Sequence, residues 1–147
     1  MRYCNCTKEQ VCELLIETSI TESAKERIRR SLSDAPLRLF ADGEIRSKET
    51  GYVLEKIPGF SEEELGFFCW EGTGADILDS GAVEIVYTWV YGALGDFHGA
   101  LLKAFSTAEE DNYARLCEGF PDIGMAFSLW RKRGDDWLYE EHHGAPR

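Results

Sequence analysis

Two runs of acidic residues are the side chains in this sequence whose type and spacing could do chemistry. Each run has three consecutive carboxylates and opens a predicted helix. The runs are Glu62, Glu63 and Glu64, and Glu109, Glu110 and Asp111. Acids in a first turn suit the positive end of the helix dipole, by about 0.3–1 kcal/mol per charge. They could also imitate DNA phosphates or bind rows of Lys and Arg on a partner, so a solvated surface and a binding surface both stay open.

The acidic charge is concentrated in the middle of the chain. The 147 residues carry a formal net charge of −11, and the segment 57–128 has thirteen acids against only Lys103 and Arg115. The two flanking segments are balanced. Such a segment gives a negative field over about a Debye length, ~8 Å at physiological salt. We therefore expect it to repel a nucleic-acid backbone and to attract basic protein surfaces.

Several aromatic residues lie inside the same acidic segment. They are Phe67, Phe68, Trp70, Tyr87, Trp89 and Tyr91. Aromatic rings can stack nucleic-acid bases, but phosphate would be repelled here. Core packing or a protein interface is the better interpretation, and Trp70 and Trp89 are the candidate interface residues.

The cysteine and histidine spacing does not predict a metal site. Cys4, Cys6 and Cys12, with the pair His142-His143, could supply soft ligands, yet Cys-x-Cys-x5-Cys is not a zinc knuckle. Cys4 and Cys6 are also too close in sequence for an unstrained disulfide with each other. We expect buried or reduced thiols, in a reducing compartment.

The sequence carries no motif of a known catalytic or cofactor site. It lacks a Gly-x-Ser-x-Gly elbow, a phosphate loop and a His-Glu-x-x-His pair, and Gly72-Thr73-Gly74 lacks the third glycine of a dinucleotide site. Asp96-x-His98 is typical of a helix start, and a nucleophilic Cys69 or Cys117 beside His98 would need a fold that the sequence does not reveal. The protein is therefore predicted not to be an enzyme and to have no metal and no cofactor.

Local signals predict a mainly α fold of the α+β class, with five or six short helices and one small β-hairpin near residues 37–48. Thr7 with Gln10, and Ser61 with Glu64, have the capping-box spacing, and a second helix is expected over about 21–33. Asp42-Gly43 favours a two-residue type I′ turn, with a further strand in GYVLEKI.

The second half contains one ambiguous segment and two further predicted helices. Residues 83–91 combine a helical stripe with strand-forming side chains, and helix is the favoured of the two. We expect Thr107 to cap one helix, Gly119 to end it in a left-handed conformation, and a last helix over about 122–132. Residues 1–147 are predicted to be a single domain with a flexible tail over 135–147.

One resemblance is carried by residues that follow the apolar LLKAF stretch. They are Asn112, Arg115, Leu116, Gly119, Phe120 and Pro121. With them, residues 94–130 resemble small acidic bacteriophage accessory proteins. The resemblance implies a mostly helical protein, and some such proteins inhibit host defence systems, including CRISPR effectors and restriction enzymes.

Together these observations predict a phage-encoded, non-enzymatic inhibitor that binds a protein. Its partner would be a basic nucleic-acid-handling complex such as a CRISPR effector, with no direct contact to nucleic acid. The alternative is a helical interaction module or homodimer that acts through an aromatic patch, with acids only for solubility. No apolar run of about 20 residues and no signal-peptide pattern occurs, so we expect no membrane contact and a location in the host cytoplasm.

Overall fold

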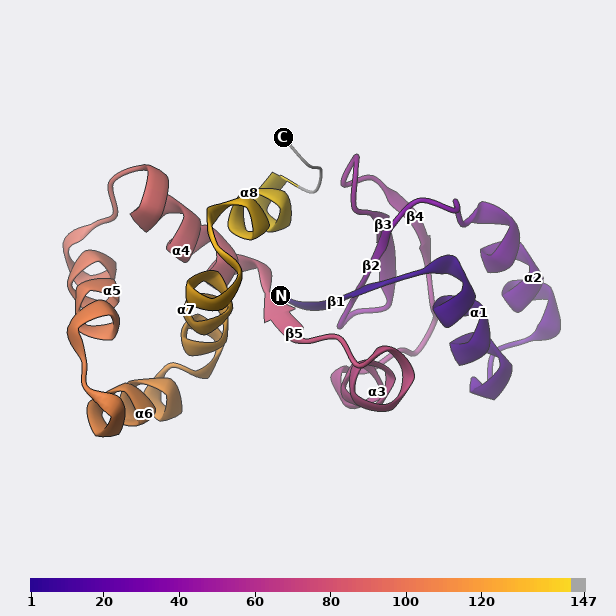
Figure 1. Cartoon of the computed structure of the whole chain (residues 1–147). Coiled ribbons are helices and arrows are strands. Elements are labelled where there is room, and N and C mark those ends of the chain that lie inside the picture. The colour runs from indigo at the N-terminus through magenta and orange to yellow at the C-terminus, as the bar shows by residue number, and fades with distance from the viewer. Residues whose placement is uncertain (144–147) are drawn as a thin grey trace. The chain divides into compact units, whose positions relative to one another are not determined.

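The computed structural model describes residues 1–143, apart from the side chains of residues 70–72, and divides the chain into two compact units. Unit 1 is Met1–Ile77 and unit 2 is Leu78–Arg147. The colours of Figure 1 give the residue number along the chain. Each unit is described by itself below. That the two units together constitute one domain stays a prediction.

Unit 1 is built on an antiparallel sheet. Its strands are β1 (Arg2–Cys6), β2 (Leu37–Phe40), β3 (Glu44–Ser47) and β4 (Val53–Lys56), and β5 (Ile77–Asp79) carries the chain out of the unit. The strand order is β4-β3-β2-β1-β5, and Leu39 of β2 pairs with Cys4 on one side and with Ile45 on the other. All three side chains are fully buried, because alternate residues of a strand point to one face.

Three α-helices and one π-helix complete unit 1. They are α1 (Lys8–Glu17), α2 (Glu22–Ser31), α3 (Glu62–Phe67) and the π-helix η1 (Phe68–Thr73). Val11 and Leu15 of α1, Ile28 of α2 and Leu65 of α3 are fully buried in the same cluster as the sheet residues. The unit therefore has its own core.

The predicted helix starts of unit 1 are confirmed. Thr7 accepts a hydrogen bond from the Gln10 backbone N–H, and the Gln10 side chain accepts one from the Thr7 N–H. Ser61 likewise caps α3 by accepting from the Glu64 backbone N–H. The flanking Phe60 and Leu65 are both buried, as a hydrophobic staple requires.

The turn between β2 and β3 differs from the predicted type I′ turn. That turn needs a positive φ at both central residues, whereas only Gly43 has one, at 92°, and no described non-glycine residue has a positive φ. The loop has three residues, 41–43, closed by the Gly43 N–H donating to the Phe40 carbonyl at 2.9 Å. Its Asp42 carboxylate instead accepts from the Glu44 N–H at 3.0 Å.

Unit 2 is helical. Its helices are α4 (Ser80–Tyr91), α5 (Asp96–Thr107), α6 (Glu110–Gly119), α7 (Pro121–Arg133) and α8 (Asp135–His143). α7 packs against α4, α6 and α8, and the largest fully buried side chains include Phe105, Phe127, Leu102 and Leu138. Residues 83–91 lie within α4, so helix is the correct one of the two interpretations.

Three predicted features of unit 2 are wrong. Residues 135–143 form α8 instead of a flexible tail, and Leu138 of this helix is fully buried, whereas residues 144–147 of the predicted tail lie outside the described residues. Thr107 is the last residue of α5, where its hydroxyl donates to the Lys103 carbonyl, and Glu109 is the N-cap residue of α6. Gly119 is not left-handed, because α7 starts at Pro121 and leaves no room for a Schellman ending.

The α+β class is confirmed at the level of class, but the counts of elements are wrong. The described residues form eight α-helices and a five-stranded sheet, more than the predicted five or six helices and one hairpin. None of the described helices is long and apolar enough to cross a membrane.

Candidate protein-binding site

The first acidic run lies where its sequence predicts, at the start of α3 in unit 1. Glu62, Glu63 and Glu64 are all exposed. Glu62 forms an ion pair with Arg2, with 3.6 Å between Oε1 and Nη1 and with its side chain still 63% exposed. The three acids therefore differ in their surroundings, and Glu64 lines a groove.

That groove lies between α1 and the α3–η1 segment and has a volume of about 430 Å³. Glu13 and Glu17 of α1 line it opposite Glu64, and the Ser61 hydroxyl donates to the Glu64 carboxylate at 3.3 Å. Phe67 also lines it, although 63% of this residue is exposed to solvent. We call Glu13, Glu17, Glu64 and Phe67 the acidic groove.

The chemistry of the acidic groove suits a cationic side chain. Every charged residue that the structure describes in its wall is a glutamate. A Lys or Arg side chain placed there could lay its aliphatic stem on Phe67 and bring its charge to the carboxylates. Glu13, Glu17 and Phe67 were not singled out as site residues from the sequence. The available signal was the row Glu9, Glu13 and Glu17, because like charges four residues apart destabilise a helix.

The second acidic run lies in unit 2 and is divided between two surfaces. Glu109, Glu110 and Asp111 are all exposed at the start of α6. Glu109 lines a second groove of about 680 Å³ together with Asn112 and Arg115, whereas Glu110 and Asp111 lie outside that groove. The three residues consequently do not present one uniform acidic surface.

The two tryptophans predicted for an interface have different outcomes. Trp89 of α4 is half-buried, and its ring lies 6.0 Å from that of Phe127 and 5.7 Å from that of Trp130. Trp89 thus contributes to the packing of unit 2, and its role in binding stays a prediction. The side chain of Trp70 lies outside the described part of the structure.

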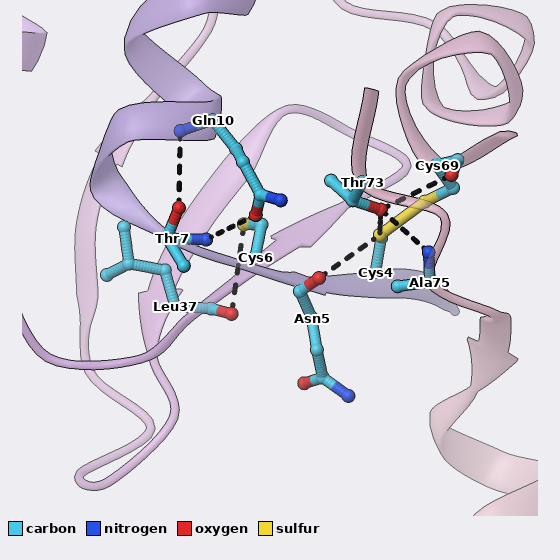
Figure 2. Close-up of a disulfide and its surroundings, with 9 residues drawn as sticks. All are labelled: Cys4, Asn5, Cys6, Thr7, Gln10, Leu37, Cys69, Thr73 and Ala75. Atoms are coloured by element: carbon cyan, nitrogen blue, oxygen red, sulfur yellow. Dashed lines mark hydrogen bonds between the residues drawn. A yellow bond between two sulfur atoms is a disulfide. The ribbon is translucent and has the colours of Figure 1, made fainter. Parts of the chain in front are cut away.

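The sequence predicts that the cysteines are buried or reduced thiols, but two of the five form a disulfide. Figure 2 shows Cys4 of β1 joined to Cys69 of η1 by a disulfide, with Cα atoms 6.3 Å apart and the Thr73 hydroxyl oxygen 3.5 Å from the Cys4 sulfur. Cys6, Cys12 and Cys117 remain free. Sequence spacing could not indicate this pairing, because the two cysteines are 65 positions apart in the chain.

Two of the three free cysteines, Cys6 and Cys117, lie in surroundings that disfavour the nucleophilic thiolate. Burial raises the pKa of Cys6 to about 12, and burial also raises the pKa of Cys117. His98 of α5 contacts the ring of its neighbour Phe97, with 5.4 Å between centroids. Within the described part of the chain, no three His, Cys, Asp or Glu side chains are placed to hold a metal ion.

The terminal histidines lie on α8 and contact α4. The Tyr87 ring stacks on His142 with centroids 3.9 Å apart, and the Tyr87 hydroxyl is 2.9 Å from Nε2 of His143. These contacts hold the end of α8 in unit 2.

Comparison with known proteins gives no relative. No protein-family model, no curated protein and no solved structure matches this chain. The candidate site is therefore inferred from the geometry of its described residues.

Proposed function

We propose that this protein binds a basic surface of a protein that handles nucleic acid, and thereby blocks that surface. The observation that carries the proposal is the acidic groove of unit 1, in which three glutamates surround a hollow beside the exposed Phe67. Proteins that bind DNA or RNA present rows of Lys and Arg to phosphate. Such rows offer the charge and the aliphatic stems that this groove accepts.

The arginines of α2 also support binding to a basic protein surface instead of binding to nucleic acid. The arginines of α2 are engaged within the unit, where Arg27 pairs with Glu55 and both Arg29 and Arg30 pair with Glu26. These arginines thus form ion pairs with the unit's own carboxylates. Direct binding of a nucleic-acid backbone is accordingly not part of the proposal.

The narrower part of the proposal concerns the partner and its location. We propose a phage-encoded inhibitor of a host defence complex such as a CRISPR effector, acting in the host cytoplasm. The resemblance of residues 94–130 to phage accessory proteins supports it.

The proposed location has a consequence for the disulfide. In a reducing compartment Cys4 and Cys69 would be thiols. The Asn5 carbonyl oxygen, 3.4 Å from the Cys4 sulfur, is then an acceptor for the Cys4 S–H.

A defined peptide tests the acidic groove directly. The probe is a fluorescent peptide of alternating arginine and leucine, and the variant is Glu13→Gln, Glu17→Gln, Glu64→Gln, which keeps a residue suited to the capping position at 64. The matched control is Glu9→Gln, Glu49→Gln, Glu84→Gln, which changes the net charge equally at exposed positions outside the groove.

The expected result is a loss of binding of about tenfold in the groove variant, because each exposed ion pair contributes about 0.5 kcal/mol, three are removed, and about 1.4 kcal/mol corresponds to tenfold. The control should bind like the original chain, and 0.5 M salt should weaken both. Equal affinities of the groove variant and the control would show that the groove does not bind the peptide. Displacement of DNA from a purified CRISPR effector tests the narrower part.

A further inference from the structure

Helix α6 of unit 2 has one packed face and one open face. Its packed face meets the core through Tyr113, whose ring lies 5.7 Å from Phe105 and 6.2 Å from Phe127. The Tyr113 hydroxyl also hydrogen-bonds to Ser128 of α7. Yet α6, all of whose residues are described, contains no buried residue. Figure 1 shows α6 where α5 ends and α7 begins, at the edge of the unit.

The open face of α6 lines the groove of about 680 Å³. Glu109, Asn112, Arg115 and Leu116 have the spacing of one helix face, and the small Ala104 and Ala108 from the end of α5 lie beside them. We call Glu109, Asn112, Arg115 and Leu116 the α6 face. It has one acid at one end, one base at the other and an amide at its centre.

The charges of the α6 face do not satisfy each other within one chain. Glu109 and Arg115 are six residues apart, about 9 Å along a helix, and only residues three or four apart are neighbours on a helix surface. Neither side chain forms an ion pair with any residue in the described part of the chain. Arg115 is also one of only two basic residues among residues 57–128.

A two-fold axis makes this arrangement self-complementary. In a two-fold dimer, a residue that contacts a second residue of the other copy is matched by the reverse contact. When two antiparallel α6 helices cross at Asn112, Glu109 is three residues before the crossing and Arg115 three residues after it. Each Glu109 thereby meets the Arg115 of the other copy, which gives two ion pairs.

The remaining residues of the α6 face fit the same crossing. An Asn side chain has both donors and an acceptor, so the two Asn112 amides can bond to each other across the axis. A polar residue at such a position specifies the register of paired helices. Leu116 is four residues from the crossing, and the small side chains of Ala104 and Ala108 line the same groove, which leaves space there for an apolar side chain of the other copy.

We infer that the α6 face binds the α6 face of a second copy of this chain, antiparallel and with Asn112 at the two-fold axis. This inference goes beyond the proposed function, since it concerns unit 2 and does not use the acidic groove. The charges of the α6 face favour a second copy as the partner, because that copy supplies an Arg115 for Glu109 and a Glu109 for Arg115. A purely basic partner would leave Arg115 facing a like charge.

Charge exchange tests the inference by sedimentation equilibrium in 0.15 M salt. The chain itself should form a dimer. In Glu109→Arg, an arginine at 109 of each copy faces Arg115 of the other copy, and in Arg115→Glu, Glu109 of each copy faces a glutamate. Both variants bring like charges together, so each should weaken the dimer at least about tenfold. The double variant Glu109→Arg, Arg115→Glu restores both ion pairs and should recover the affinity to within about threefold.

Matched controls separate this contact from a general effect of charge. Glu110→Arg changes the net charge as Glu109→Arg does, at an exposed residue outside the groove, and Lys103→Glu does the same for Arg115→Glu. Both controls should remain dimeric, and circular dichroism should show every variant folded. Cross-linking gives a second readout: Asn112→Cys should form a disulfide dimer with oxidised glutathione, and Glu110→Cys should not.

Three results would overturn the inference. One is a chain that stays monomeric up to about 0.2 mM, which leaves the α6 face without a second copy. Another is a dimer that neither single exchange weakens, which places the contact on another surface. The third is a double variant that stays as weak as the single ones, because the crossed ion pairs then do not exist.

Discussion

At the scale of single residues, Gly43 shows how a turn is tied to its surroundings. Its φ of 92° favours glycine, and a Cβ built on it would lie against the Ile57 carbonyl oxygen and 2.9 Å from the Phe60 Cβ. The Gly43 carbonyl in turn accepts from the Ile57 N–H at 2.9 Å. Any side chain at 43 therefore meets both backbone strain and a steric clash with the segment that enters α3.

The first prediction concerns Gly43→Ala. The substitution should lower the free energy of unfolding by about 2–4 kcal/mol, because strain from a positive φ and overpacking add. Gly51→Ala is the matched control: Gly51 has a φ of 75° but nothing within 4 Å of the added Cβ, so only the strain applies, about 1 kcal/mol. Urea unfolding of both variants measures the difference. Equal losses would mean that the contact with Ile57 is relieved at no cost.

The second prediction concerns Cys6 at high pH. Burial raises its pKa from 9.0 to about 12, so between these values the folded chain keeps a proton that the unfolded chain loses. Stability that is present below pH 9 is therefore lost as the pH rises toward 12, by up to about 1.4 kcal/mol per pH unit. The stability difference between the original chain and Cys6→Ala should shrink by about 2 kcal/mol from pH 8 to pH 10.5. A constant difference in urea unfolding would contradict the raised pKa.

At the scale of elements, the sequence predicts what is encoded by neighbouring residues. The caps at Thr7 and Ser61 depend on residues three positions apart, and both are confirmed. β1 was missed because its residues RYCNC show no clean alternation and its partners β2 and β5 are distant in the chain. α8 was missed because its burial comes from α4 and α7, which supply the apolar contacts for Leu138.

The candidate site likewise has one part that the sequence predicts and one part that depends on tertiary contacts. The exposed positions of Glu62, Glu63 and Glu64 follow from the cap at Ser61, so the sequence predicts them. The groove beside Glu64 depends on how α1 packs near η1, which is a tertiary contact that no local pattern encodes. The division of Glu109 from Glu110 and Asp111 likewise follows from the position of α5.

The third prediction concerns the disulfide between β1 and η1. It closes a loop across a sequence separation of 65, so reducing it should lower the free energy of unfolding by about 2–4 kcal/mol, chiefly by freeing the unfolded chain. Cys69→Ala should show a similar loss and no further response to dithiothreitol. Cys12→Ala, at a free and half-buried cysteine, is the control and should keep the response. A chain whose urea midpoint ignores dithiothreitol would not contain this bond.

At the scale of the whole molecule, acids outnumber bases by eleven, and several ion pairs within the described residues are largely exposed to solvent. In the pair of Arg27 with Glu55, for example, the arginine side chain is 59% exposed. Exposed pairs contribute only about 0–1 kcal/mol each, so repulsion among unpaired carboxylates is the larger long-range term. The excess lies in residues 57–128, which contribute to both units.

The last prediction follows from this excess of negative charge. Repulsion is stronger in the compact state than in the expanded one, so screening it should stabilise the fold. The free energy of unfolding should rise by on the order of 1 kcal/mol between 20 and 200 mM NaCl, as the Debye length shortens. Urea is the denaturant to use, because guanidinium is itself a salt, and the protein concentration is held fixed. The variant Glu9→Gln, Glu49→Gln, Glu84→Gln has less charge to screen and should show a smaller rise. If stability instead falls with salt, the ion pairs around Glu26 and Glu55 outweigh the repulsion, and the acidic segment does not destabilise the folded chain.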